Sequence, residues 1–209
     1  MASPHIIERN SRADWALMTT IHVALRRDLD QLLHTTASRT VARARWTVFR
    51  NQLRLHLAAE QVALWPLARV KLAGDPRGQA LIDAMEDEHQ LIGPLLAVAD
   101  DAFAMDTDAT RLRHLLTRLD TRLSSHLAHE EADALPLIGQ IVSQRELRRI
   151  TRAIRGGRGV RGAAKTLPWA LAHASPAHRT RVLGQLSAPA RLLYRRAWLP
   201  RYTLTTQPL

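Results

Sequence analysis

Four long stretches of the chain before residue 142 repeat apolar residues at steps of three and four positions, the spacing of one helix face. They cover about residues 12–34, 39–72, 76–104 and 108–141, and only short connections separate them. Asp75 and Pro76 mark one start, because aspartate caps helices and proline fits the first helical position. Long amphipathic helices with short connections pack as antiparallel neighbours. The sequence therefore predicts an all-α fold, an antiparallel up-and-down four-helix bundle.

The net charge of +11 is unevenly distributed along the chain. Residues 1–142 hold 16 basic and 18 acidic residues, a balance of −2, whereas residues 143–209 hold 14 basic residues and one acidic residue, a balance of +13. We therefore expect a bundle over 1–142 and a basic, partly helical C-terminal extension over 143–209. The extension could bind nucleic acid or an anionic membrane. We favour the alternative in which its apolar residues dock on the bundle.

One histidine interrupts each of the four apolar seams, and two seams carry a glutamate one turn later. Residues at i and i+4 share a helix face, so each glutamate should point inward with its histidine. A buried carboxylate costs several kcal/mol unless it is paired or binds a metal, and two such carboxylates repel each other. A pair of metal ions would remove both costs. The candidate ligands are His22, His56, Glu60, His89, His126 and Glu130.

The two segments with the His-x-x-x-Glu spacing also resemble each other. Residues 56–67 align without gaps on residues 126–137, and six of the twelve positions are identical. This predicts a duplicated helix pair with pseudo-twofold symmetry. Four imidazoles and two carboxylates suit iron, manganese or zinc. The alternative is a set of satisfied core histidines and helix-surface glutamates, which the aligned repetition argues against.

Other polar residues near the seams have less specific interpretations. His129 and Asp133 form a competing pair at the same spacing, but Ala59 occupies the position aligned with His129. The repeat therefore favours His126 as the ligand, and we expect His129 and Glu131 beside the ligands, where they would orient them. The acidic run 86–88 is expected on a solvated face.

Taken together, these positions resemble the hemerythrin-like, or HHE cation-binding, family over roughly residues 12–142. The resemblance implies a four-helix bundle with a non-haem diiron centre, for which manganese or zinc is a less favoured metal. It also implies that Glu60 and Glu130 bridge the irons. By the same resemblance, His22 and His56 would serve one iron, and the other pair, His89 and His126, the second. The basic extension is similar to one on actinobacterial members.

The chain departs from the respiratory hemerythrins at two positions. Gly93 stands where those proteins have a further histidine, and Glu131 stands where they have an aspartate. Two histidines per iron leave positions open for O₂, H₂O₂ or NO. Three classes of function remain: an enzyme with catalase-like activity, a sensor or interaction protein that acts through the extension without turnover, and a metal-free interaction bundle.

The chain lacks cysteine and long apolar segments, which limits the possible ligand chemistry and the expected location of the protein. The chain has no cysteine, which excludes disulfides and thiolate ligands. Its first residues lack the apolar segment of a secretion signal, and no apolar run approaches the ~20 residues of a membrane span. We therefore expect a cytoplasmic protein.

Overall fold

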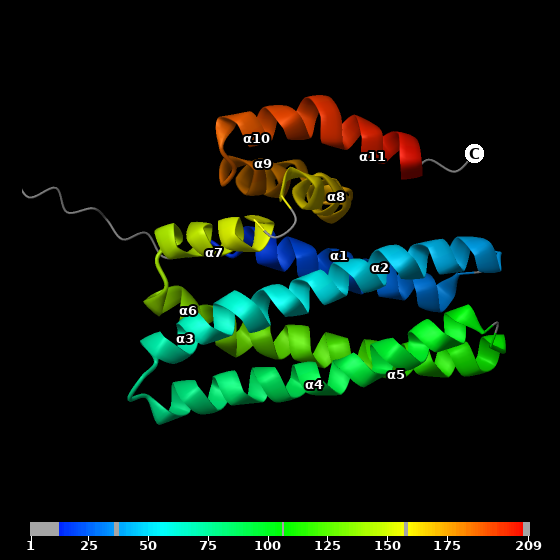
Figure 1. Cartoon of the computed structure of the whole chain (residues 1–209), viewed down its shortest axis with the longest axis horizontal. Coiled ribbons are helices and arrows are strands. Elements are labelled where there is room, and N and C mark those ends of the chain that lie inside the picture. The colour runs from blue at the N-terminus through cyan, green and yellow to red at the C-terminus, as the bar shows by residue number, and fades with distance from the viewer. Residues whose placement is uncertain (1–12, 36–37, 106, 157–158, 207–209) are drawn as a thin grey trace, which may run out of the picture.

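The computed structural model describes residues 13–35, 38–105, 107–156 and 159–206. Its first part is a bundle of four long helical segments that run alternately up and down (Figure 1). The all-α bundle predicted from the sequence is therefore confirmed. The segments are α1 (Ala16–His34); α2 (Arg39–Ala59) with η1 (Glu60–Leu64) and α3 (Trp65–Lys71); α4 (Pro76–Ala104); and α5 (Ala109–His129) with η2 (Glu130–Ala134) and α6 (Leu135–Ile141).

Local sequence sets the ends of these helices. The Asp75 carboxylate accepts the backbone N–H groups of Arg77 and Gly78, and Pro76 occupies the first turn of α4. Gly74 precedes this cap with φ +90°, a left-handed conformation that glycine adopts without a steric penalty. Asp108 caps α5 in the same way as Asp75 caps α4. These contacts keep the connections short and the neighbouring helices antiparallel.

The second and fourth segments each contain a π-helical turn at the glutamate of the His-x-x-x-Glu spacing. In η1 the N–H of Trp65 donates to the carbonyl of Glu60, five residues earlier. In η2 the N–H of Leu135 donates to the carbonyl of Glu130. Single π turns within α-helices occur frequently at functional sites. Within the bundle, the two wider turns therefore begin at the two predicted carboxylate ligands.

A proline follows each π turn at the same distance. Pro66 and Pro136 lie six residues after the first residue of the turn, and Pro200 has the same relation to a third π turn in the extension. Proline has no N–H and its ring crowds the carbonyl four residues earlier, which favours a wider turn. Pro94 and Pro168 lie inside helices without such a turn, so proline permits the bulge without dictating it.

The two halves of the bundle repeat one pattern of lengths. Each of the segments with a π turn has 21 α-helical residues, five π-helical residues and seven further α-helical residues. Two apolar clusters fill the bundle toward its two ends. The first includes Leu25, Leu29, Phe49, Leu53, Leu119 and Leu123, and the second includes Leu64, Trp65, Ile82, Met85 and Ile138.

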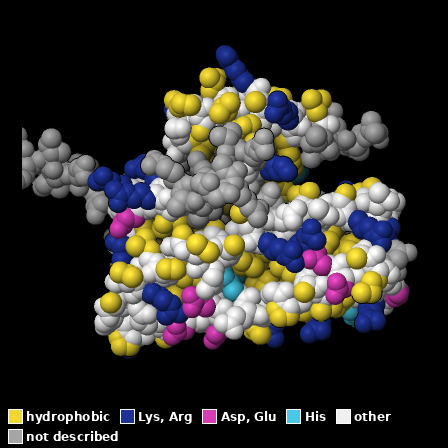
Figure 2. Space-filling model, in the orientation of Figure 1, with side chains coloured by type: hydrophobic (Ala, Val, Ile, Leu, Met, Phe, Trp, Pro, Cys, Tyr) yellow, Lys and Arg dark blue, Asp and Glu magenta, His cyan; other side chains and the backbone are white. Residues whose placement is uncertain are grey.

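The extension continues from the bundle as further helices. In Figure 1 its last four helices lie together beside the face formed by α1 and α2. The visible face of this part carries basic but no acidic side chains (Figure 2). The elements are α7 (Gln144–Gly156), α8 (Gly159–Leu171), α9 (Pro176–Gly184), α10 (Ala188–Leu193), η3 (Tyr194–Trp198) and α11 (Leu199–Thr206).

Apolar side chains attach the extension to the bundle. Ala16 of α1 packs in one buried cluster with Leu171, Tyr194 and other residues of the extension. Trp169 enters the first apolar cluster of the bundle, and its indole N–H donates to the Asp28 carboxylate at 2.6 Å. The extension therefore docks on the bundle as expected. Within the described residues, no helix has both the length and the apolar character needed to cross a membrane.

Candidate metal centre

The six predicted ligands come together in the middle of the bundle. Each of the four long segments contributes one histidine, and the two π turns contribute the glutamates. All six side chains are buried, and the most exposed of them, His89, is only 9% exposed. The residues are His22, His56, Glu60, His89, His126 and Glu130.

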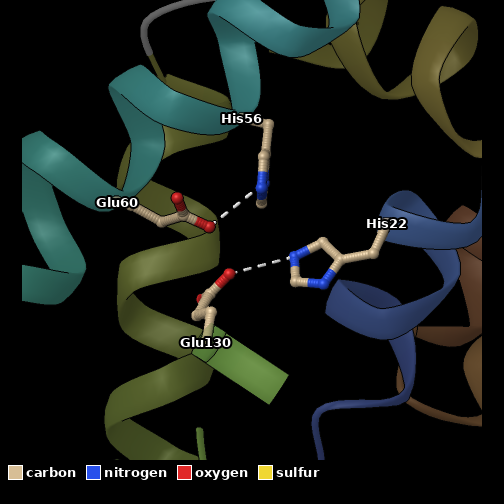
Figure 3. A group of neighbouring side chains, drawn as sticks. All are labelled: His22, His56, Glu60 and Glu130. Atoms are coloured by element: carbon tan, nitrogen blue, oxygen red, sulfur yellow. Dashed lines mark ion pairs between the residues drawn. The ribbon is translucent and has the colours of Figure 1, made fainter. Parts of the chain in front are cut away.

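Their ligand atoms form two groups that share one residue. In the first group, one donor atom from each of four residues lies within 4.8 Å of all the others; Figure 3 shows His22, His56, Glu60 and Glu130 pointing toward one another. The second group contains Glu60, His89 and His126 under the same limit. Glu60 is thus placed between the two groups, whereas Glu130 belongs to the first.

Close contacts connect the histidines and carboxylates within each group. His56 Nδ1 lies 3.1 Å from Glu60 Oε1, and His22 Nε2 lies 3.2 Å from Glu130 Oε2. On the other side, His89 Nε2 lies 3.3 Å from Glu60 Oε2. The imidazole rings of His22 and His56 are 4.9 Å apart, and those of the second pair, His89 and His126, are 4.6 Å apart.

Several of these polar atoms are buried without a hydrogen bond. Across the described part of the chain, both oxygens of Glu60, both oxygens of Glu130 and the Nε2 atoms of His22 and His56 lack a hydrogen-bond partner. Buried polar atoms are nearly always satisfied in folded proteins. Four unsatisfied carboxylate oxygens facing imidazole nitrogens are the environment that a bound cation would satisfy, so the residues present fit a metal ion.

The pKa shifts of Glu60, His56 and His89 point the same way. Burial, followed by the nearby Glu130 carboxylate, raises the pKa of Glu60 well above its usual 4.5. Burial, followed by the other histidines, lowers the pKa of His56 well below 6.5, and burial with His126 lowers the pKa of His89 to about 3. These two imidazoles are therefore neutral, the form in which histidine binds a metal. A cation would favour the ionised form of Glu60.

Glu131 orients one of the histidines from outside the cluster. Its Oε1 atom accepts from His22 Nδ1 at 2.8 Å and from the Arg26 guanidinium at 2.8 Å. Partial burial opposes ionisation, but His22 and Arg26 outweigh it and lower the pKa of Glu131 to about 2. Glu131 therefore lies beside His22, one of the predicted ligands.

Glu88 has the corresponding place on the other side, and sequence analysis missed it. Its two oxygens lie 2.8 Å from His126 Nδ1 and 2.8 Å from His129 Nδ1. His129 therefore contacts this outer carboxylate and belongs to neither of the two groups. Of the run 86–88, which was expected on a solvated face, only Asp87 is exposed, whereas Glu86 and Glu88 are both partly buried and paired. The one feature of the sequence that could have indicated this role of Glu88 is its position directly before the seam residue His89.

Glu88→Gln and Glu131→Gln are expected to weaken metal binding by about 10- to 100-fold, because outer carboxylates fix the orientation of ligand histidines. Competition with a chelator of known affinity would measure the change. Glu86→Gln is the matched control, since Glu86 is buried to a similar degree but pairs with Arg69 rather than with a histidine. Unchanged metal affinity in both variants would contradict the positioning role.

The fold and the buried cluster define a helical bundle built to hold metal. A family model described as the hemerythrin HHE cation binding domain matches residues 14–138, more than half of the chain. The chain therefore belongs to this family, and it is a metal-binding protein. Comparisons with curated proteins and with solved structures found no match. The family match does not reach the extension, whose likeness to actinobacterial members stays a prediction.

Proposed function

We propose that the protein holds two non-haem iron ions and reacts with or senses a small ligand such as O₂, H₂O₂ or NO. The position of Glu60 in both groups of donor atoms carries this proposal, because one carboxylate placed between two sets of histidines suits a pair of ions. A mixed set of imidazoles and carboxylates favours iron over metals that prefer only one of these donors.

Each residue has a role in this proposal. His22 and His56 would hold one iron, His89 and His126 would hold the other, and Glu60 would serve both. Glu130, which lies in the first group, would be the second shared carboxylate. When bound, the iron pair supplies open coordination positions and a reversible change of oxidation state.

The chain's own residues set the conditions at the centre. The two apolar clusters on either side exclude water from the buried carboxylates. Glu131 holds the imidazole of His22, and Glu88 holds that of His126. Glu88 also contacts His129, whose side chain is 33% exposed, and so connects buried His126 to a histidine near the solvent.

A sensor function is the second candidate, and the docking of the extension favours it. α1 carries His22 and also contacts the extension, where Thr20 hydrogen-bonds His178 of α9. A change at the centre could therefore reach the extension through a single helix. Turnover of peroxide that is lost in His56→Ala would support the enzyme, whereas a ligand-dependent change in the extension without turnover would support the sensor. A cytoplasmic location remains part of the proposal.

Metal content is the first test of the proposal. The chain would be purified from iron-replete cells, and its iron would be measured together with its near-ultraviolet absorption. Two irons per chain with an oxo-bridge charge-transfer band are expected. A folded chain that refuses added Fe(II) would overturn the diiron assignment.

A further inference from the structure

A cavity of about 510 Å³ lies between the bundle and the extension. Small-molecule sites typically occupy 300–1,000 Å³ and are mostly apolar. α1 and α2 form one wall, and α7, α8 and the connection after α9 form the other. Apolar side chains line both walls, including Leu17, Ile21, Leu55, Leu147 and Leu167. The docked extension therefore creates a space that the bundle alone would leave open.

The cavity reaches the proposed metal ligand His56. The pseudo-twofold repeat shows why it opens at this histidine. Glu88 directly precedes His89 and hydrogen-bonds His126 from outside, whereas the corresponding residue before His22 is Ile21, which lines the cavity. In the second half of the bundle, the Glu88 carboxylate therefore contacts His126. In the first half, the corresponding position is occupied by the apolar Ile21, and the cavity lies next to His56.

The charges around the cavity are unequal. Asp14 lines it but is paired with Arg181 through two contacts of 3.0 and 3.1 Å. Arg148 also lines it, and within the described ranges no carboxylate lies within ion-pair distance of its guanidinium. The unpaired charge on the lining is therefore positive, which complements an anionic group.

We propose that this cavity binds an amphipathic organic anion. Its apolar body packs against Leu17, Ile21 and Leu55, and its acidic group pairs with Arg148. Binding itself requires only the cavity, whereas an effect on the metal centre rests on the proposed function, in which His56 is an iron ligand. The protein then couples an organic ligand to the centre, in addition to the small inorganic ligand proposed above.

Calorimetric titration of decanoate into the full chain tests the cavity, in metal-free and iron-loaded protein. Saturable binding with one site per chain is expected in both forms. Arg148→Glu should weaken binding about tenfold or more, because it removes a charge-assisted contact and adds repulsion. Arg149→Glu is the matched control, since Arg149 is exposed on the same helix and does not line the cavity. Decanol should bind more weakly than decanoate.

Filling the cavity gives an independent test. Ala163 lines the wall contributed by α8, and Ala163→Trp should abolish decanoate binding while the helical circular dichroism is retained. In iron-loaded protein, decanoate should shift the charge-transfer band of the parent chain but not that of Ala163→Trp. If this variant does not fold, the Arg148→Glu and Arg149→Glu pair still decides the question.

The outcomes separate this proposal from the diiron assignment. No saturable binding to the metal-free chain, or binding insensitive to Arg148→Glu, would overturn the cavity proposal even if two irons load. A chain that binds decanoate but takes no iron would overturn the diiron assignment alone. Decanoate binding without any spectral shift in loaded protein would overturn the coupling to His56.

Discussion

Glu60→Gln is expected to abolish metal binding and, at the same time, to make the metal-free chain more stable. Glu60 belongs to both groups of donor atoms, so its loss removes a ligand from each. In the metal-free chain the same carboxylate is fully buried, and its oxygens lack hydrogen bonds within the described structure. Replacing such a buried carboxyl group should raise the free energy of unfolding by on the order of 1–3 kcal/mol at a pH where the unfolded chain ionises it.

The gain from Glu60→Gln should depend on pH. Burial and Glu130 raise the pKa of Glu60, so the folded state holds its proton more tightly than the unfolded state. For a group of this kind, the penalty to the folded state is absent below the unfolded pKa and grows as the pH rises above it. The stability difference between variant and parent should therefore be larger at pH 8 than at pH 5.

Urea unfolding with and without Fe(II) would measure both effects. Glu86→Gln again serves as the control, because it removes a carboxylate that lies outside both groups. The control should keep its stabilisation by metal, and Glu60→Gln should lose it. A Glu60→Gln chain that is less stable without metal, or that still gains stability from iron, would contradict this account.

Trp65→Ala is expected to cost about 3–5 kcal/mol of stability, the range for truncating a large buried aromatic. Trp65 is fully buried beside the π turn, and its ring lies 6.0 Å from that of His89. Its indole N–H is buried without a hydrogen-bond partner in the described chain. Trp65→Phe removes that unsatisfied group and keeps most of the packing, so it should cost less than about 2 kcal/mol.

Thermal and urea unfolding of the metal-free variants would give these values without interference from the centre. Val62→Ala is a suitable control, since Val62 lies on the same π turn and is 76% exposed. Its effect should stay within about 0.5 kcal/mol. Equal losses for Trp65→Ala and Trp65→Phe would show that the indole packs more specifically than the structure indicates.

The helix periods of the sequence were enough to predict the bundle and the gathering of the six polar residues. A residue every three or four positions faces the core in any packing of amphipathic helices, so the seam histidines had to point inward. Their places near the middle of each helix made it reasonable to expect them at a common level. The role of Glu88 was not predicted because this residue lies one position away from the seam. Its partners His126 and His129 come from the neighbouring helix. Contacts between helices depend on axial register, which periodicity leaves undetermined.

Neither the π turns nor the cavity could be predicted from the sequence, and the physical reasons differ. A spacing of four residues between His56 and Glu60 fits an α-helix as well as the start of a π turn, so the spacing alone does not reveal the wider form. The cavity depends on where the extension docks, and residues such as Ile21 and Arg148 come from distant parts of the chain. Contacts between such distant residues are tertiary, so the local spacing of apolar and polar residues does not predict them.

Each π turn can also be regarded as the trace of one inserted residue. An ordinary α-helix would accommodate the same span with one residue fewer, so deleting the exposed Val62 should turn the wide turn into a regular α turn. Trp65 would then still face the core that it now fills, whereas the same deletion in a regular part of the helix would rotate all later residues by about 100°. The π turn is therefore a position where the chain can gain or lose one residue without rebuilding the end of its bundle.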